Sequence, residues 1–457
     1  MPREVLDYLQ QQQPKFLQQL AEIVAIDGVS TDGQHRQELA QAAAWTKQAL
    51  EQAGFTKVEA HPLEAGADLI VGELLVDPAL PTVLCYSHYD VQPVSPEHWT
   101  KTTPYAMTTD GEFAYGRGVQ DDKGGLVAQL AAIEAYHATG QRLPVNVKML
   151  VEGLEEVGSP GLVPFIAQHQ ELLKADVIVV TDTDNLRIGA PAITNSLRGN
   201  MALDIVVRSS KFPSHSGTTG NGLADPALAL CELLARLQAS GGRYAVPGFY
   251  DQVRGLSPDE QAMMRSLETD EATLRKRFGV VDGVALASPA NEFLLRTTRW
   301  PAMTVIGLEA GSLSHPSNQV LAEAKAILSV RLVPDMDVET TSRLLQDFLT
   351  TQAPWGVQVE VTPHGAGVGP WMAAPEGESF TAALAALEQG YGHPAAYLGS
   401  GGTIGYVGPA SELQQATPLL LGISGGNAHS HDEFLHLGDW HKLQASLVHL
   451  LEGLARK

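Results

Sequence analysis

The sequence has few cysteines, which limits how the fold can be stabilised. Only Cys85 and Cys231 occur among 457 residues, far apart and each inside an apolar segment. A disulfide framework needs several cysteines and an oxidising compartment, so we expect reduced thiols and a reducing environment. The first residues lead into an amphipathic pattern without the apolar core that signal peptides have. We therefore expect a cytoplasmic protein.

Positive charge and long apolar runs are scarce as well. Lys and Arg number 30 against 52 for Asp and Glu, which gives a formal net charge of −22 at pH 7. A strongly acidic surface repels nucleic acids and anionic membranes, so neither is expected as a partner. No apolar run approaches the roughly 20 residues that a membrane-spanning helix needs.

Between residues 69 and 194, short apolar runs alternate with longer amphipathic segments. The predicted strands of this segment are 82–87, 145–151 and 176–181, and its predicted helices are 123–139 and 160–173; two further helices, 3–26 and 34–54, are predicted before it. This alternation is typical of an α/β fold with a mostly parallel sheet and flanking helices. Ligands of such sheets bind beyond the carboxyl ends of the strands.

The pattern changes near residue 197. Strands and helices are predicted at 203–207, 226–238, 303–308, 325–333, 339–350 and 357–361, with a charged helical stretch at 257–277. The order strand-helix-strand-strand-helix-strand is that of a ferredoxin-like α+β domain. Patterns at 380–388, 418–423 and 439–455 then resume the first domain. Because 457 residues exceed one compact core, we predict a catalytic domain at 1–196 and 366–457, interrupted by an inserted domain at 197–365.

Acids and histidines repeatedly follow the apolar runs or stand in glycine-rich turns. They are His88 and Asp90, Asp121 and Asp122, Glu155 and Glu156, Asp182 and Asp184, and His429 and His431. Soluble proteins keep charge away from buried strands, so this repetition indicates convergence on one site. Several carboxylates cannot stay ionised together without a cation, and His with Asp or Glu is a zinc-type ligand set. The sequence therefore predicts a metal site.

Ordinary structural explanations compete with this hypothesis. One acid of the Asp121-Asp122 pair could cap a helix, since Asp is favoured at helix N-termini. The Glu155-Glu156 pair could be a solvated helix start; alternatively, one Glu binds metal while the other faces an activated water as general base. The residues by themselves also leave open the choice between Asp182 and Asp184, and between His429 and His431.

The motifs have a familiar order: His88-x-Asp90, Gly116-Arg-Gly-x-x-Asp121-Asp122-Lys-Gly, Glu155-Glu156-x-Gly-Ser, Asp182 and His429. This order resembles the dinuclear-zinc exopeptidase superfamily, and more closely its carnosinase-like or cytosolic nonspecific dipeptidase branch. That branch is also similar at Asp90-Val-Gln-Pro93, and at Pro191-Ala-Ile-Thr194 before Leu197-Arg-Gly199. The resemblance covers nearly the whole chain.

The resemblance implies a role for each residue of the motifs. Two divalent ions are expected per chain, first of all zinc, although manganese or cobalt would accept the same ligands. The implied ligands are His88 and Asp182 at one ion, Glu156 and His429 at the other, and Asp121 bridging both. Spacing to the motifs at 191–194 and 197–199 favours Asp182 over Asp184. Glu155 is the implied general base, and Asp90 the residue that orients His88. The family often has a cis peptide bond after the bridging Asp.

The inserted domain matches further motifs of the family. Ser214-His215-Ser-Gly217 is similar to one whose histidine reaches across a dimer to polarise the scissile carbonyl. Arg331-Leu-Val-Pro334 is similar to one whose arginine binds the substrate's terminal carboxylate, a task that suits a guanidinium group. Gly401-Gly402-Thr403 resembles a turn that binds the substrate backbone. A homodimer through the inserted domain is therefore expected.

These expectations describe a metal-dependent hydrolase that cleaves dipeptides or very short peptides. An N-acyl-amino-acid deacylase would use the same site on a different amide and is the alternative. A non-catalytic binding protein that kept the fold is a more remote reading, because every expected ligand and the base have matching residues. Residues 217–222 and 427–433 depart from the usual family sequences, so the sequence leaves the preferred substrate open.

Overall fold

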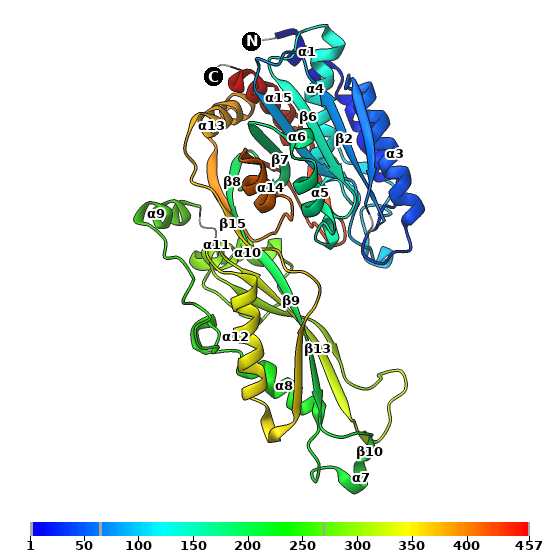
Figure 1. Ribbon diagram of the computed structural model, residues 1–457, viewed down its shortest axis with the longest axis vertical. Coiled ribbons are helices and arrows are strands. Elements are labelled where there is room, and N and C mark those ends of the chain that lie inside the picture. Colours follow the sequence, from blue (N-terminus) through cyan, green and yellow to red (C-terminus); the bar gives the residue numbers. More distant parts are fainter. Residues whose placement is uncertain (1–2, 64–65, 268–269, 456–457) are drawn as a thin grey trace. The chain divides into compact units, whose positions relative to one another are not determined.

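The computed structural model describes residues 3–63, 66–267 and 270–455 (Figure 1). Internal contacts divide the chain into two compact units. The first contains Met1–Asn195, Ala373–Ser400 and Ile404–Lys457, and the second contains Ser196–Met372 and Gly401–Thr403. The predicted inserted domain ended at residue 365, whereas the second unit continues to Met372 and also includes the turn 401–403.

The first unit is built around a mixed β-sheet. Its strands are β1 (Lys57–Pro62), β2 (Asp68–Leu74), β3 (Thr82–His88), β6 (Asn146–Glu152), β7 (Val177–Asp184), β8 (Ala192–Leu197), β16 (Ala396–Ser400) and β17 (Thr417–Ile423). They follow the order β1-β2-β6-β3-β7-β17-β8, and β16 also pairs with β8. The pairs β6-β3, β3-β7 and β7-β17 are parallel. The carboxyl ends of β3, β6 and β7 therefore lie at one edge of the sheet.

Helices cover both faces of this sheet. They are α1 (Arg3–Gln11), α2 (Gln13–Val24), α3 (Arg36–Gln52), α4 (Lys123–Thr139), α5 (Leu162–Gln168), α6 (Gln170–Leu173), α13 (Glu378–Tyr391), α14 (Val407–Gln414) and α15 (Leu437–Leu454). α4 packs on β3 and β7 and is covered in turn by α1, α2 and α15. Residues 123–136 are all buried, which explains why apolar side chains lie around the whole circumference of α4. Within the described residues, no helix combines the length and apolar character that crossing a membrane would take.

Strand β3 shows how both faces are filled. Val83 and Cys85 belong to the large core cluster shared with α4. Tyr86 points to the opposite face, because successive strand residues alternate, and its ring stacks on Tyr406 with centroids 4.2 Å apart. Every residue of β3 after Thr82 is buried. A continuous apolar run is what such a strand requires.

The second unit has the predicted ferredoxin-like plan. Its main elements are β9 (Gly199–Arg208), α8 (Pro226–Arg236), β11 (Ala302–Glu309), β13 (Glu323–Leu332), α12 (Val338–Thr351) and β14 (Gln358–Pro363). The strands form an antiparallel sheet in the order β11-β13-β9-β14. Burial alternates along β9, since one face of the sheet packs on the second core cluster, which includes Leu230 and Leu345 of the two helices. The predicted fold class is thus confirmed.

Three predicted helices are interrupted. The segment 3–26 is two helices, with Pro14 in the first turn of α2. The segment 160–173 breaks at His169 into α5 and α6. The charged stretch 257–277 contains α9 (Pro258–Ser266) and α10 (Glu271–Arg277), and the intervening residues 268–269 lie outside the described part of the chain.

Short elements complete the structure. They are β4 (Thr108–Thr109), β5 (Phe113–Tyr115), β10 (Ser214–His215), α7 (Ser216–Thr219), α11 (Phe293–Arg299), β12 (Gln319–Val320), β15 (Trp371–Met372), β18 (Gly425–Gly426) and β19 (Phe434–His436), with 3₁₀ turns at Pro96–His98, Glu155–Val157, Ser240–Gly242, Ala290–Glu292 and Pro354–Gly356. A small sheet in the order β18-β19-β5-β4 was not predicted. It places the segment around His429 beside the turn that carries Asp121.

Candidate metal centre

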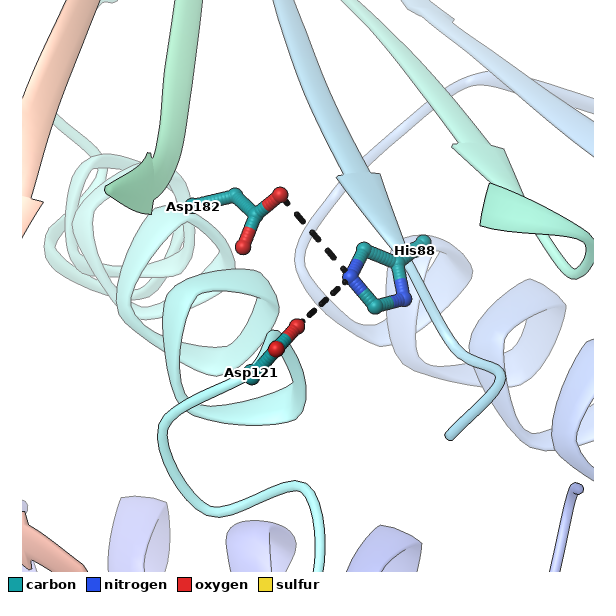
Figure 2. Close-up of side chains that lie close together, drawn as sticks. All are labelled: His88, Asp121 and Asp182. Carbon is teal, nitrogen blue, oxygen red and sulfur yellow. Dashed lines mark hydrogen bonds and ion pairs between the residues drawn. The ribbon is translucent and has the colours of Figure 1, made fainter. Parts of the chain in front are cut away.

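Figure 2 shows His88, Asp121 and Asp182 facing one another at the edge of the main sheet. His88 ends β3 and is fully buried. Its Nε2 lies 3.1 Å from Asp121 Oδ1 and 3.9 Å from Asp182 Oδ2. Asp182 belongs to β7, the neighbouring parallel strand, while Asp121 precedes α4. The common polarity of β3 and β7 brings His88 and Asp182 together, and the turn before α4 adds Asp121.

A second cluster shares Asp121 with the first. Nε2 of His429 lies 2.9 Å from Asp121 Oδ2 and 3.1 Å from Glu156 Oε2. In each cluster, one donor atom from each residue lies within 4.8 Å of the others. The two oxygens of Asp121 therefore face two different histidines, which is the arrangement that a bridging carboxylate needs.

The protonation of these groups is strongly perturbed. Burial, together with neighbouring carboxylates, raises the pKa of Asp182 well above its usual range, and the same causes act on Glu155. Burial also opposes ionisation of Asp121, but hydrogen bonds from His429 and His88 outweigh it and lower the pKa of Asp121. Burial lowers the pKa of His429, yet Asp121 and Glu156 raise it to about 10.

This donor set fits divalent cations. Crowded carboxyl groups can all ionise when positive charge lies between them. Two imidazole nitrogens and three carboxylates, with one carboxylate common to both clusters, are ligands that zinc, manganese and cobalt accept. The geometry is compatible with the predicted ligand assignment, and the individual roles remain a proposal.

Asp90 connects the first cluster to the Glu155-Glu156 turn. It is fully buried, and its Oδ1 lies 3.3 Å from Nδ1 of His88. Its two carboxylate oxygens also accept hydrogen bonds from the backbone N–H groups of Glu155 and Glu156, at 3.2 and 3.1 Å. One carboxylate thus lies beside the imidazole of His88 and accepts from the backbone of both glutamates, while the backbone oxygen of Asp90 lies 3.1 Å from the same Nδ1.

The turn Glu155–Val157 is held from two further sides. Gln92 Nε2 donates to Oε2 of Glu156 at 2.9 Å. The buried carboxyl group of Glu152 accepts from Ser159 Oγ at 2.8 Å and from Tyr86 at 2.5 Å. Sequence reasoning missed both residues: Gln92 lies within a motif that it identified, whereas Glu152 comes directly after the strand predicted at 145–151.

The turn before Asp121 is organised by Glu433, which sequence reasoning also missed. The buried carboxylate of Glu433 accepts hydrogen bonds from the N–H groups of Gly118, Gln120 and Asp121, at 3.0 to 3.2 Å. The peptide bond between Asp121 and Asp122 is cis. Asp122 accepts from Ser87 Oγ and therefore lies beside the main sheet.

Asp184 and His431, the alternatives to Asp182 and His429 as metal ligands, belong to neither cluster. Asp184 is exposed and accepts a hydrogen bond from Gln120 Nε2 at 3.1 Å. His431 is also exposed, and its ring lies 6.1 Å from that of His98. The two clusters contain Asp182 and His429.

The remaining predicted site residues belong to the second unit. Arg331, in β13, donates through Nη1 to Thr403 Oγ1 at 2.9 Å. The hydroxyl group of Thr403 donates in turn to the backbone carbonyl oxygen of Arg198. The side chain of Arg198 donates through Nε to the carbonyl oxygen of Gly401 at 3.1 Å. The structure thus groups Arg331 with the turn 401–403, which includes Gly402.

His215 lies at the other end of the second unit's sheet. Arg331 pairs with Asn200 at the beginning of β9, whereas His215 comes seven positions after β9 ends at Arg208. Figure 1 shows β10 and α7 at the tip of this unit. His215 is exposed, and its Nδ1 accepts a hydrogen bond from Gly217 N at 3.0 Å.

Comparison with known proteins gives consistent matches along the chain. Residues 84–453 match the model of peptidase family M20/M25/M40. The Cys-Gly metallodipeptidase DUG1 of Candida albicans is 30% identical over 95% of this chain and 94% of its own length. The human Beta-Ala-His dipeptidase is 31% identical over 97% of this chain and 90% of its own. The solved structure of the Saccharomyces cerevisiae di-peptidase Dug1p superimposes with a TM-score of 0.88 at 26% identity, covering 100% of this chain and 98% of that one.

Proposed function

The chain belongs to peptidase family M20/M25/M40, and from this membership we propose that it is a metallodipeptidase that uses two divalent ions. The observation that carries the proposal is Asp121, whose two oxygens face His88 and His429 at 3.1 and 2.9 Å. The family resemblance predicted from the motifs is confirmed. Relatives that are named as metallodipeptidases match the chain over almost its whole length.

The proposed ligands follow the two clusters. His88 and Asp182 would hold one ion, and Glu156 and His429 would hold the other. Asp121 belongs to both clusters and would contribute to both ions. When bound, such ions lower the pKa of a water molecule to near neutrality and polarise the scissile carbonyl. Zinc is the first candidate, and manganese or cobalt suits the same donors.

Glu155 is the proposed general base. Its backbone N–H is fixed on Asp90, and its side chain belongs to the same turn as the ligand Glu156. It would take a proton from the attacking water and deliver that proton to the amine nitrogen as the C–N bond breaks. Each dipeptide would thereby yield two amino acids. Positioned proton transfer of this kind contributes roughly 10²- to 10⁴-fold in rate.

Arg331 and Thr403 are the proposed recognition site for the carboxylate of the substrate. Their hydrogen bond holds a guanidinium edge against a glycine-rich turn, and a guanidinium binds carboxylates in bidentate fashion. A dipeptide amide lacks that carboxylate. Arg331→Gln should therefore raise KM for dipeptides at least tenfold and leave the slow hydrolysis of the matching amide unchanged.

A homodimer through the second unit is part of the proposal. β11 is an edge strand of its sheet, and Val305, Ile306 and Leu308 on it are 43 to 61% exposed. An exposed apolar edge strand is a ready pairing surface. A dimer would also give His215 a partner subunit's site to serve. Sedimentation of the wild type against Ile306→Lys tests this, and a wild-type monomer at micromolar concentration would reject it. A cytoplasmic location remains a prediction from the cysteine content.

The main experiment combines metal analysis with a substrate panel. The protein is freed of metal with a chelator, reloaded with zinc, manganese or cobalt, and assayed on dipeptides, tripeptides and N-acetyl amino acids. We expect two ions per chain and hydrolysis of dipeptides that disappears with the chelator and returns with metal. Exclusive activity on N-acyl substrates would make the protein a deacylase, and metal binding without any hydrolysis would reject an enzymatic role.

A further inference from the structure

A cavity of about 600 Å³ in the second unit contains none of the residues assigned to metal or substrate. It lies among the loop 243–256, α9 and α11. Leu256, Met264, Leu294 and Leu295 make part of its wall apolar, and Tyr250 and Trp300 add aromatic surface. Ligand cavities typically have roughly 300–1,000 Å³ and combine such apolar walls with a few converging polar groups.

The polar groups here are mostly guanidinium groups. Arg243, Arg254, Arg265 and Arg299 line the cavity. Arg254 and Arg299 donate to the same oxygen of Glu260, at 2.7 and 2.6 Å. Two positive charges therefore share one carboxylate. This concentration of positive charge stands out in a chain whose net charge is −22.

Arg243 is held in place by aromatic rings. Its guanidinium carbon lies 4.1 Å from the ring centroid of Tyr250 and 5.5 Å from that of Trp300. Among the described side chains, it has no carboxylate partner. Stacking uses the face of a guanidinium group and leaves its N–H edge free to bind an oxyanion.

We propose that this cavity binds a small organic anion, with its carboxylate or phosphate group on Arg243 and its apolar body against Leu256, Leu294 and Trp300. The apolar walls distinguish this ligand from a simple inorganic anion. The guanidinium edge suits carboxylates and phosphates alike. The test therefore has one arm for each.

One helix separates this cavity from the turn 401–403. Leu294 and Leu295 of α11 line the cavity. Gly401 lies against the backbone of the same helix, because a Cβ atom added at Gly401 would lie 2.6 Å from the carbonyl oxygen of Thr297. Arg198 also donates both to Trp300 O, at 3.3 Å, and to Gly401 O, at 3.1 Å. An anion that shifts α11 or Trp300 therefore moves the turn that contains Thr403.

This coupling rests on the proposed dipeptidase function, whereas binding of the anion does not. The occupied cavity would change KM for dipeptides, since Thr403 accepts the hydrogen bond from Arg331. Because both α11 and the turn belong to the second unit, the effect requires no change in the metal ligands.

Titration calorimetry of the metal-loaded protein tests the site. The probes are benzoate, phenyl phosphate and the neutral benzamide. Arg243→Gln is compared with Arg277→Gln, an exposed arginine that stacks on Phe278 at 5.3 Å and does not line the cavity. Each variant loses one positive charge from an arginine that stacks on an aromatic ring, so the two variants differ only in where that charge lies.

We expect benzoate or phenyl phosphate to bind one per chain to the wild type and to Arg277→Gln, and at least tenfold more weakly to Arg243→Gln. Whichever anion binds identifies the ligand class. Absence of saturable binding by both anions overturns the site, as does equal binding by the two variants or by benzamide. An anion that binds without changing KM or kcat overturns the coupling. Calorimetry decides the site even if no dipeptide is hydrolysed.

Discussion

Arg117 and Glu433 form a buried ion pair that connects three loops of the metal centre. Arg117 Nη1 donates to Oε2 of Glu433 at 2.6 Å, and the side chains are 2% and 0% exposed. Nη2 of Arg117 also donates to Pro93 O and Ser430 O, at 3.3 and 3.1 Å. The pair thus joins the loop after Asp90, the turn before Asp121 and the loop after His429.

Removing one member of this pair should weaken both the fold and metal binding. In Arg117→Met, the buried carboxyl group of Glu433 loses its ion-pair partner, which costs roughly 3–5 kcal/mol of unfolding free energy. Urea denaturation measures the loss. Metal analysis should show weaker binding of the ion assigned to His429. Arg142→Met, which removes an exposed arginine paired with Asp77, is the control and should change little. A similar small effect in both variants would contradict a stabilising role for the buried pair.

Replacement of Glu155 should separate chemistry from metal binding. Glu155→Gln keeps the shape and the backbone hydrogen bond to Asp90 but cannot accept the proton. We expect kcat to fall at least about 100-fold while two ions per chain remain bound. Glu156→Gln serves as the matched neighbour and should lose metal together with activity. Loss of metal from Glu155→Gln would show that the two roles are exchanged or shared.

The two histidines of the last loop should differ in their importance. His429 contacts Asp121 and Glu156, whereas His431 lies beside His98. His429→Ala should bind one ion less per chain and lose activity, and His431→Ala should keep both ions and most of the activity. Plasma emission analysis and a dipeptide assay decide between them, and the reverse pattern would assign the ligand to His431.

Thiol labelling tests the burial of β3. Burial raises the pKa of Cys85 to about 12, so at pH 8 roughly one molecule in 10⁴ carries the reactive thiolate at this position. Cys231 is exposed on α8. Ellman's reagent should therefore modify one thiol per native chain at pH 8 and two after unfolding. Because the thiolate fraction of Cys85 rises tenfold with each pH unit below 12, its slow labelling should accelerate towards alkaline pH. Rapid modification of both thiols in the native protein would refute this burial.

The residues that face the proposed ions were predictable because each belongs to a local pattern. His88 and Asp182 follow apolar runs that became the parallel strands β3 and β7, and parallel strands end at the same edge. Glu433 and Arg117 were not predictable in this way, since the contact spans 316 positions. Pairing of β5 with β19 creates that proximity, and strands of three residues leave too little periodicity to be recognised.

Local breaks within helices escaped prediction for a related reason. Apolar spacing continues across Gln12, although the structure divides the segment into α1 and α2. Pro14 signals the break, because proline is tolerated in the first turn of a helix and disrupts a helix interior. The predicted strand positions in the second unit were accurate to a few residues, since alternation along β9 and β13 reflects burial of one face.

Because β17 lies between β7 and β8, the main sheet cannot be completed until the C-terminal part of the chain has been synthesised. β17 pairs with β7 on one side and with β8 on the other. A ribosome releases residues 177–197 long before residues 417–423, and residues 196–372 can fold in the interval. During that time β7 and β8 each present an unpaired edge, which promotes aggregation. A chain truncated before residue 417 would keep both edges without their β17 partner.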